Sequence, residues 1–353
     1  MLVWSLGCGE TAPHESAEDG SFSAPDHAFP MPYDTLSAYD FFEHPMVNFT
    51  PKSGVIPYQV ASPTWADHAE KARFVVVPRG HTITIETSGE WTFPDGTIVI
   101  KNFFYALDRR DMDASATPIE TRLLIKEGDD WTGHTYVWNE TLTEATRKIA
   151  GRRVHLNFLD EHGTPTEQEY VVPNTNQCKD CHEIERRNGL LGLVPRQIVR
   201  SVLRDGRVVD QVEWLASKLP FNGGRPEPHP SPLIDPFGDG SLNDRARSYL
   251  DANCSHCHRD GGNGGRTGLV LLASETNLTK VGVCKGPVAA GAGTGDRLQD
   301  IVPGFPEDSI LVYRMQSADP EIKMPEIPNR LPHHAGVDLV SEWIRQMEPK
   351  GCP

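Results

Sequence analysis

The chain has 353 residues, enough for two or three domains, and 38% of them are hydrophobic, as in globular proteins. Its formal net charge of −15 at pH 7 disfavours binding to nucleic acid and adsorption to anionic lipid, and favours a basic partner. The alternative is that this charge serves solubility alone. No apolar run reaches the roughly 18 residues needed to cross a bilayer.

Residues 1–33 are predicted to be a lipoprotein-like start followed by a flexible tether. The stretch Ser5-Leu6-Gly7-Cys8 resembles the lipobox of bacterial lipoproteins, in which the cysteine receives lipid, although Leu6 stands one place off the usual position. The following polar residues, up to about residue 32, have too little apolar surface to bury a core. The alternative is an ordinary flexible N-terminus without lipid on Cys8.

Residues 34–174 are predicted to form an antiparallel, β-rich domain, either a sandwich or a barrel. After a short helix or apolar anchor in Leu36–Phe42, apolar and β-branched residues recur with a period of two, and clusters of Gly, Pro and Asp separate them. A helix is expected over Glu140–Ala150. The expected strands are Arg73–Val77, His81–Thr87, Thr97–Tyr105, Thr121–Lys126, Thr135–Trp138, Val154–Leu159 and Gln168–Val172.

The remainder is predicted to be helical and rich in loops, so that the fold class is α+β with several domains. Residues 175–238 form a first unit and residues 239–353 a second, with a Pro- and Gly-rich linker over 220–240. The last expected helix has one apolar face. The expected helices are Cys178–Gly189, Pro195–Leu203, Val208–Lys218, Leu242–Asn253, Ser309–Met315 and Gly336–Met347.

Each of these two units contains the pattern C-x-x-C-H, which is the attachment signature of c-type haem. Positions i, i+3 and i+4 share one face of a helix, so two thiols can form thioethers while the histidine ligates the iron. The sequence therefore predicts two covalently attached haems. The alternative is a zinc site made from both cysteine pairs. Zinc ribbons separate their two pairs by about 15–20 residues, whereas Cys178 and Cys254 are 76 positions apart, and a ribbon would not explain the histidine after each pair. The predicted haem-binding residues are Cys178, Cys181, His182, Cys254, Cys257 and His258.

The second unit resembles a class I cytochrome c domain. A helix leads into Cys254–His258, the pattern P-G-x-P-x-x-S-x-L follows within Ile301–Leu311, and Lys323-Met324-Pro325 precedes an amphipathic helix. This resemblance implies that Met324 is the distal iron ligand of the second haem, a pairing that raises the reduction potential. Core packing is the alternative role for Met324.

From about residue 34 to its end, the chain also resembles a family of bacterial dihaem c-type cytochromes of uncertain function. The resemblance implies the architecture and the two haems, and no substrate. The matching stretches include Val55–Tyr58, Phe93–Thr97, Glu120–Leu124, Tyr136–Asn139, Pro173–Cys178 and Cys284–Gly291.

The first haem has no obvious distal ligand, because no methionine follows its signature before Met315 in the second unit. Residues Trp91–Lys101 loosely resemble a strand motif of β-rich, lysine-linked haem oxidoreductases, but too few positions match to predict a cross-link at Lys101. An open iron would suit a small ligand. The candidate ligands are Met46, His68, His81, Met112, His134 and His229.

Two functions follow from these patterns, and the sequence leaves open whether the chain is an enzyme. The first is a periplasmic dihaem cytochrome that carries electrons between redox partners, one of which has a basic docking face. The second is a haem enzyme, a peroxidase or small-molecule oxidoreductase, with an open first haem. The periplasm is expected because c-type haem is attached outside the cytoplasm, with the outer membrane reached only through lipid on Cys8.

Two further cysteines, Cys284 and Cys352, lie outside the signatures in the second unit. In an oxidising compartment a disulfide between them is expected. The alternative is a frayed Cys352 and a buried, free Cys284.

Overall fold

The computed structural model describes residues 31–112, 116–288, 290–326, 329–349 and 351–352. Cys8 and the predicted tether up to residue 30 lie outside the described residues. Within the described ranges, no helix is long and apolar enough to cross a membrane.

The largest element is a sheet of six antiparallel strands in the order β1-β2-β5-β6-β7-β8. Alternating apolar residues build these strands, and Gly128, with its positive φ, allows the tight turn between β6 and β7. The strands are β1 (Ile56–Tyr58), β2 (Glu70–Val76), β5 (Ile98–Ala106), β6 (Ala116–Glu127), β7 (Asp130–Trp138) and β8 (Ala145–Lys148).

Smaller sheets surround the main one. The pair β9 (Arg152–Leu159) and β10 (Pro165–Val172) is antiparallel, as are β11 (Glu183–Ile184) with β12 (Arg187–Asn188), and β13 (Ser201–Arg204) with β14 (Arg207–Asp210). The third strand, β3 (Ile83–Ile85), pairs antiparallel with β4 (Trp91–Thr92) and parallel with β15 (Phe221–Asn222).

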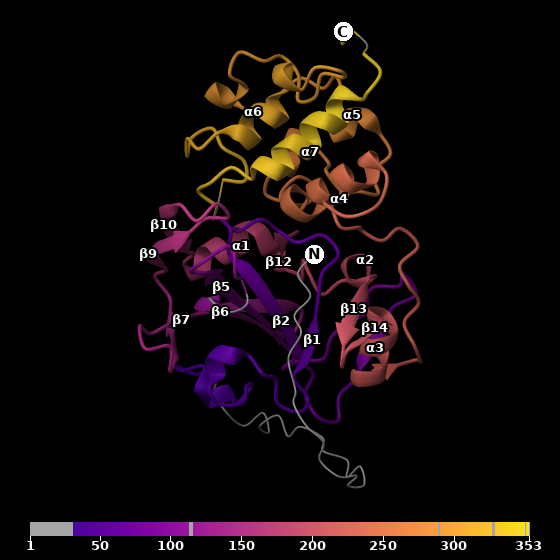
Figure 1. Ribbon diagram of the computed structural model, residues 1–353. Helices are drawn as coiled ribbons and strands as arrows, with labels where there is room; N and C mark the ends of the chain where they lie inside the picture. Colours follow the sequence, from indigo (N-terminus) through magenta and orange to yellow (C-terminus); the bar gives the residue numbers. More distant parts are fainter. Residues whose placement is uncertain (1–30, 113–115, 289, 327–328, 350, 353) are drawn as a thin grey trace.

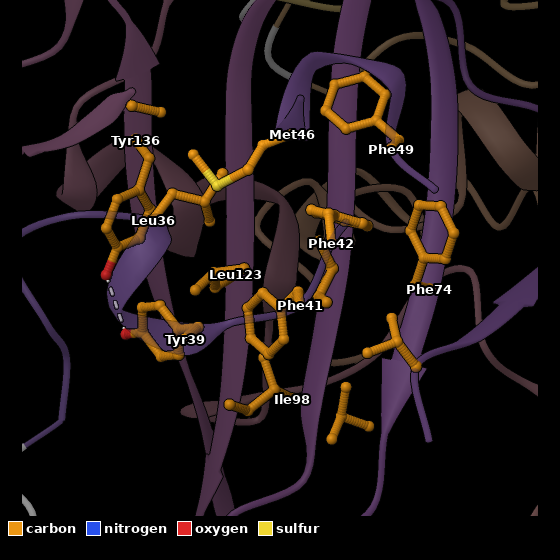
Figure 2. Close-up of a cluster of buried hydrophobic side chains, with 14 of the residues drawn as sticks. Leu36, Tyr39, Phe41, Phe42, Met46, Phe49, Phe74, Ile98, Leu123 and Tyr136 are labelled. Atoms are coloured by element: carbon orange, nitrogen blue, oxygen red, sulfur yellow. Dashed lines mark hydrogen bonds between the residues drawn. The ribbon is translucent and has the colours of Figure 1, made fainter. Parts of the chain in front are cut away.

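The two faces of the main sheet have different coverings, because successive side chains of a strand point to opposite sides. On one face, the segment around Phe41 and Phe42 packs against Phe74, Leu123 and other buried side chains, and the hydroxyls of Tyr39 and Tyr136 lie 2.9 Å apart (Figure 2). The other face packs in part against α2 and α3. This second face also carries the polar residues of the candidate site.

Seven α-helices occur in the described residues. In Figure 1 the helices from α4 to α7 lie above the main sheet, and α1 lies between these helices and the strands of the sheet. The helices are α1 (Thr175–His182), α2 (Pro195–Ile198), α3 (Gln211–Lys218), α4 (Leu242–Cys254), α5 (Leu278–Val281), α6 (Ile310–Gln316) and α7 (His334–Arg345).

The fold class expected from the sequence is wrong. The described chain is β-rich with mostly antiparallel sheets, and no α-helical cytochrome c-like unit is evident in the part that the structure describes. Helices expected between residues 178 and 218 are cut short by the hairpins β11–β12 and β13–β14, since the Asp205-Gly206 turn reverses the chain. The helix expected over Glu140–Ala150 is replaced by β8, which pairs with the edge of β7.

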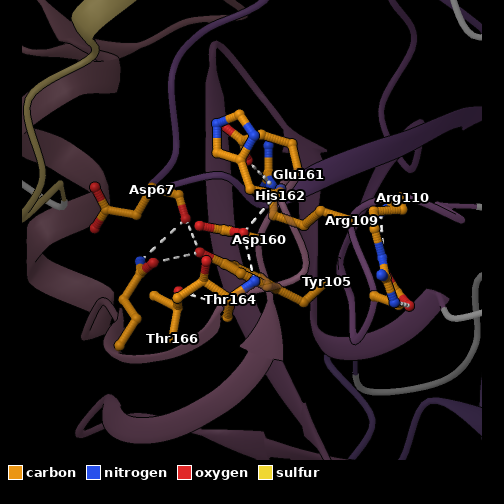
Figure 3. A network of polar contacts seen from close by, with 11 residues as sticks. Asp67, Tyr105, Arg109, Arg110, Asp160, Glu161, His162, Thr164 and Thr166 are labelled. Carbon is orange, nitrogen blue, oxygen red and sulfur yellow. Dashed lines mark hydrogen bonds and ion pairs between the residues drawn. The ribbon is translucent and has the colours of Figure 1, made fainter.

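Direct hydrogen bonds join the sheet region to the segment that precedes α7. The carboxylate of Asp67 accepts the backbone N–H groups of Arg330 at 2.7 Å and Leu331 at 3.0 Å. The backbone carbonyl of Asp67 accepts hydrogen bonds from Tyr105 and Gln168, as the close-up in Figure 3 shows. Since Asp67 is 2% exposed, it joins both regions from within the protein.

Candidate functional site

The first signature lies at the end of α1, against the main sheet. A capping box between Asn174 and Gln177 starts this helix and orients it. Cys178 then packs on β7 where Gly133 leaves room: a Cβ at Gly133 would lie 3.3 Å from both Cβ and Sγ of Cys178. Glycine at this position therefore allows α1 to approach the sheet closely.

His182 is held in one orientation and one tautomer. Its Nδ1–H donates to the carbonyl of Gly189 at 2.8 Å, and a carbonyl can only accept, so Nε2 carries no proton in the neutral ring. Burial lowers the pKa of His182 and favours this neutral form. A ring whose second nitrogen donates to a carbonyl is the usual arrangement of a metal-ligating histidine.

A large cavity separates the first signature from the sheet. It measures about 1370 Å³, including the open solvent at its mouth, and all three predicted residues of the signature line it. Cys178, Cys181 and His182 therefore share one cavity and supply the donor chemistry of a covalently held haem, two thiols and one imidazole.

The wall of the cavity opposite α1 carries three basic side chains that sequence reasoning did not assign to a site. Arg73, Lys101 and Arg122 come from β2, β5 and β6 and all line the cavity. Burial lowers the pKa of Lys101 well below its ordinary value. The available signal was a charged residue within an apolar strand, such as Lys101 directly after Ile98-Val99-Ile100.

The second signature follows α4, whose last residue is Cys254. Burial raises the pKa of the Cys254 thiol to about 12 and lowers that of His258 to about 4. The Nδ1 atom of His258 is buried without a hydrogen-bond partner, and Gly264 lies close to the ring. A buried, neutral imidazole with an unpaired nitrogen suits metal ligation.

Met324 shares a cavity with Cys254. This cavity measures about 400 Å³ including solvent at its mouth, and Met315 also lines it. The backbone N–H of Met324 donates to the carbonyl of Arg314 at 3.0 Å, which anchors the loop. The structure therefore brings Cys254 and Met324 together, whereas Cys257 and His258 do not line this cavity.

The two signatures contact each other although 76 positions separate Cys178 from Cys254. The thiol of Cys257 lies 3.3 Å from the carbonyl oxygen of Asp180, and Asn263 donates to the same carbonyl at 2.8 Å. Side chains of Cys181 and Cys257 also hydrogen-bond, which lowers the pKa of Cys181 and raises that of Cys257. Both attachment segments therefore belong to one composite site.

Of the six candidate distal ligands for the first haem, only His134 lines the first cavity. It is paired with Leu123 in the sheet, and Leu123 packs in the apolar core of the opposite face. The imidazole of His134 therefore points away from the cavity, which its neighbour Thr135 faces. Met46 is buried in that same opposite core. His68 packs against Trp65, and His81, Met112 and His229 do not line the cavity.

The disulfide between Cys284 and Cys352 is present, as the sequence predicts. It connects the turn before the Gly-rich segment to the end of the chain. None of the four signature cysteines forms a disulfide. In the described residues, no group of three or more His, Cys, Asp or Glu side chains is arranged to hold a metal ion by itself, as a zinc site would require.

Comparison with known proteins gives no relative. No family model matches the chain, and no curated protein and no solved structure matches it significantly. These comparisons therefore identify no family.

Proposed function

We propose that this chain is a dihaem c-type cytochrome that carries electrons between redox partners. The observation that supports this most is the direct contact between the two C-x-x-C-H segments, with 3.3 Å between Cys257 Sγ and the carbonyl oxygen of Asp180. Two groups attached at these segments would lie close together. The signatures alone predict two attached groups, whereas their contact supports passage of an electron from one to the other.

Each residue has a defined role in this proposal. Cys178, Cys181, Cys254 and Cys257 form thioether bonds, and His182 and His258 ligate the two irons. A c-type haem supplies a reversible one-electron iron couple when it is bound. The hydrogen bond from His182 Nδ1 to the carbonyl of Gly189, at 2.8 Å, presents Nε2 in the form that can ligate. Met324 is the proposed distal ligand at the second site.

A second candidate function, a haem enzyme such as a peroxidase or small-molecule oxidoreductase, is favoured by the lining of the first cavity. Among the described residues, no methionine lines it, and its histidines besides His182 are His134 and His256. The ring of His134 points to the other face of the sheet, and that of His256 hydrogen-bonds Cys181. An iron held by His182 would then have an open position for a small ligand.

The proposed compartment is the periplasm, with anchoring in the outer membrane if Cys8 carries lipid. The disulfide between Cys284 and Cys352 supports an oxidising compartment. The net charge of −15 supports a redox partner with a basic docking face, whose association would weaken with salt.

The test begins with mass spectrometry of the full chain matured with a haem-attachment system. The unaltered chain should carry two covalent haems. The double variant Cys178→Ser/Cys181→Ser should carry one haem, and so should Cys254→Ser/Cys257→Ser. A rapid reaction with a one-electron donor should reduce both haems of the unaltered chain with a shared fast phase, whereas each single-haem variant gives only its own spectrum.

The chain is not a dihaem cytochrome if mass spectrometry finds fewer than two haems. Binding of carbon monoxide or cyanide then separates the two functions. A carrier with two six-coordinate haems binds neither ligand, whereas binding in the variant that keeps only the first haem supports the enzyme.

A further inference from the structure

The wall of the first cavity contains a row of residues that the register of the sheet places side by side. Arg73 lies directly opposite Lys101, and Lys101 lies directly opposite Arg122. Tyr58 continues the row on β1 and Thr135 continues it on β7. All five residues line the cavity, and their direct cross-strand pairing places their side chains on one face of the sheet, the face toward Cys178, Cys181 and His182.

This row places basic side chains opposite each other on three neighbouring strands. Such pairs destabilise a sheet, and desolvation increases the cost of each charge. Arg122 has a carboxylate partner, because its guanidinium donates two hydrogen bonds to Glu120 at 2.8 and 2.5 Å. No ion pair joins Arg73 or Lys101 to an acid anywhere in the described residues.

Neighbouring residues increase the positive charge and add unpaired donors. The ammonium groups of Lys101 and Lys71 lie 4.9 and 5.9 Å from the centre of the Phe103 ring, which stabilises a cation without neutralising it. The hydroxyl of Thr135 is buried and has no hydrogen-bond partner. Thr135 is 2% exposed, so its hydroxyl is a second and independent sign of a missing polar partner.

We propose that the row Arg73–Lys101–Arg122, completed by Thr135, binds a negatively charged oxygen group inside the first cavity. An anion there offsets the repulsion within the row and accepts the unpaired hydrogen bonds. Two sources carry this chemistry: a small inorganic oxyanion that enters from solvent, and the carboxylates of the haem attached at the first signature. The inference rests on the proposed function for its second source only.

The experiment uses the full chain with both haems, and the variants Arg73→Leu and Lys101→Met. Lys126→Met is the matched control, because Lys126 lies on β6 outside the cavity and donates to the carbonyl of Gly128. Calorimetric titration with nitrite and with sulfate measures binding of a soluble oxyanion. Spectroelectrochemistry of the same samples measures the midpoint potential of each haem.

If the anion comes from solvent, nitrite or sulfate binds the unaltered chain, and Arg73→Leu and Lys101→Met each bind at least tenfold more weakly. If the anion is a carboxylate of the haem, neither probe binds, and both variants shift one midpoint potential to lower values because a nearby positive charge favours the reduced state. Lys126→Met behaves like the unaltered chain in both cases.

Thermal melting distinguishes this role from a structural one. Without a bound anion, replacing one basic residue of the row should leave the melting temperature unchanged or raise it. If that residue had a structural role instead, its replacement would lower the melting temperature. The proposal is overturned if a two-haem sample shows neither anion binding nor a shifted potential. A sample with fewer than two haems contradicts the proposed function instead, and its titration still reports whether the row binds a soluble oxyanion.

Discussion

At the scale of single residues, Gly133 controls how closely α1 approaches the sheet. A valine there would place its Cβ 3.3 Å from Cys178 Sγ and add two methyl groups beyond that contact. We expect Gly133→Val to displace Cys178 and hinder thioether formation at the first signature. Mass spectrometry should then find one haem in most molecules, and visible spectra should lose the first haem selectively.

The control for this substitution is Gly286→Val, where an added Cβ would meet only the carbonyl oxygen of Leu298 at 3.8 Å. Two haems are expected in this variant. Full loading of Gly133→Val would show that the contact with Cys178 is irrelevant to attachment.

Met324 makes a second prediction at the residue scale. It lies beside Cys254 in the smaller cavity, and a thioether ligand raises the potential of a haem. Met324→Ala should therefore lower the midpoint potential of one haem and leave the other unchanged, as measured by spectroelectrochemistry.

Met315 lines the same cavity and contains the other nearby thioether, so Met315→Leu is the matched control. This variant keeps the apolar packing of a buried side chain and should keep both potentials. If Met315→Leu shifts the potential and Met324→Ala does not, Met315 is the ligand.

At the scale of elements, the disulfide connects the end of the chain after α7 to the segment after α5. Its cysteines are 68 positions apart, and closing such a loop stabilises the fold by about 4 kcal/mol in the chain-entropy model. Cys352→Ser should lower the melting temperature and leave both haem spectra intact. Thiol titration of the denatured, unreduced wild type should find neither cysteine reactive, and two reactive thiols at these positions would exclude the bridge.

Long strands were predicted from the sequence more accurately than the elements around the first signature. Thr97–Tyr105 corresponds to β5 at Ile98–Ala106, because strong alternation and a clear turn specify it locally. In contrast, Val208–Lys218 divides into part of β14 and α3, since Arg207–Asp210 pairs with Ser201–Arg204. The Asp205-Gly206 pair was the local sign of that hairpin.

At the scale of the whole molecule, an aromatic stack joins the sheet region to the C-terminal helices. The rings of Trp65 and His333 lie 4.1 Å apart and nearly parallel, and Tyr249 contacts His333 through its hydroxyl at 3.1 Å. Burial lowers the pKa of His333 from 6.5 to about 4, with smaller contributions to this shift from the nearby groups of His68, Lys71 and His334.

The pH dependence of stability follows from this shift. Above pH 6.5 His333 is neutral in both the folded and the unfolded state, so the stability that depends on its neutral form is fully present. As the pH falls from 6.5 to about 4, the unfolded state binds a proton first, and stability is lost over that window. The melting temperature of His333→Phe, which keeps a ring on Trp65, should fall less over this window.

His155→Phe is the control for losing an imidazole, because His155 is exposed on β9. Its pH profile should follow that of the wild type. An identical acid loss in His333→Phe and the wild type would contradict the assigned role of His333. Other buried histidines, such as His68, also have a lowered pKa, so part of the acid loss of stability remains in every variant.

The sequence by itself determined the residues that are close in the chain. The spacing of Cys178, Cys181 and His182 is a local property of one helical turn, and the cysteines left outside the signatures indicated the disulfide. Only the tertiary structure decided that Asp180 contacts Cys257, and that Arg73, Lys101 and Arg122 form one row facing the first cavity. Such contacts depend on the register of distant strands, and no local spacing encodes which residues will lie opposite each other.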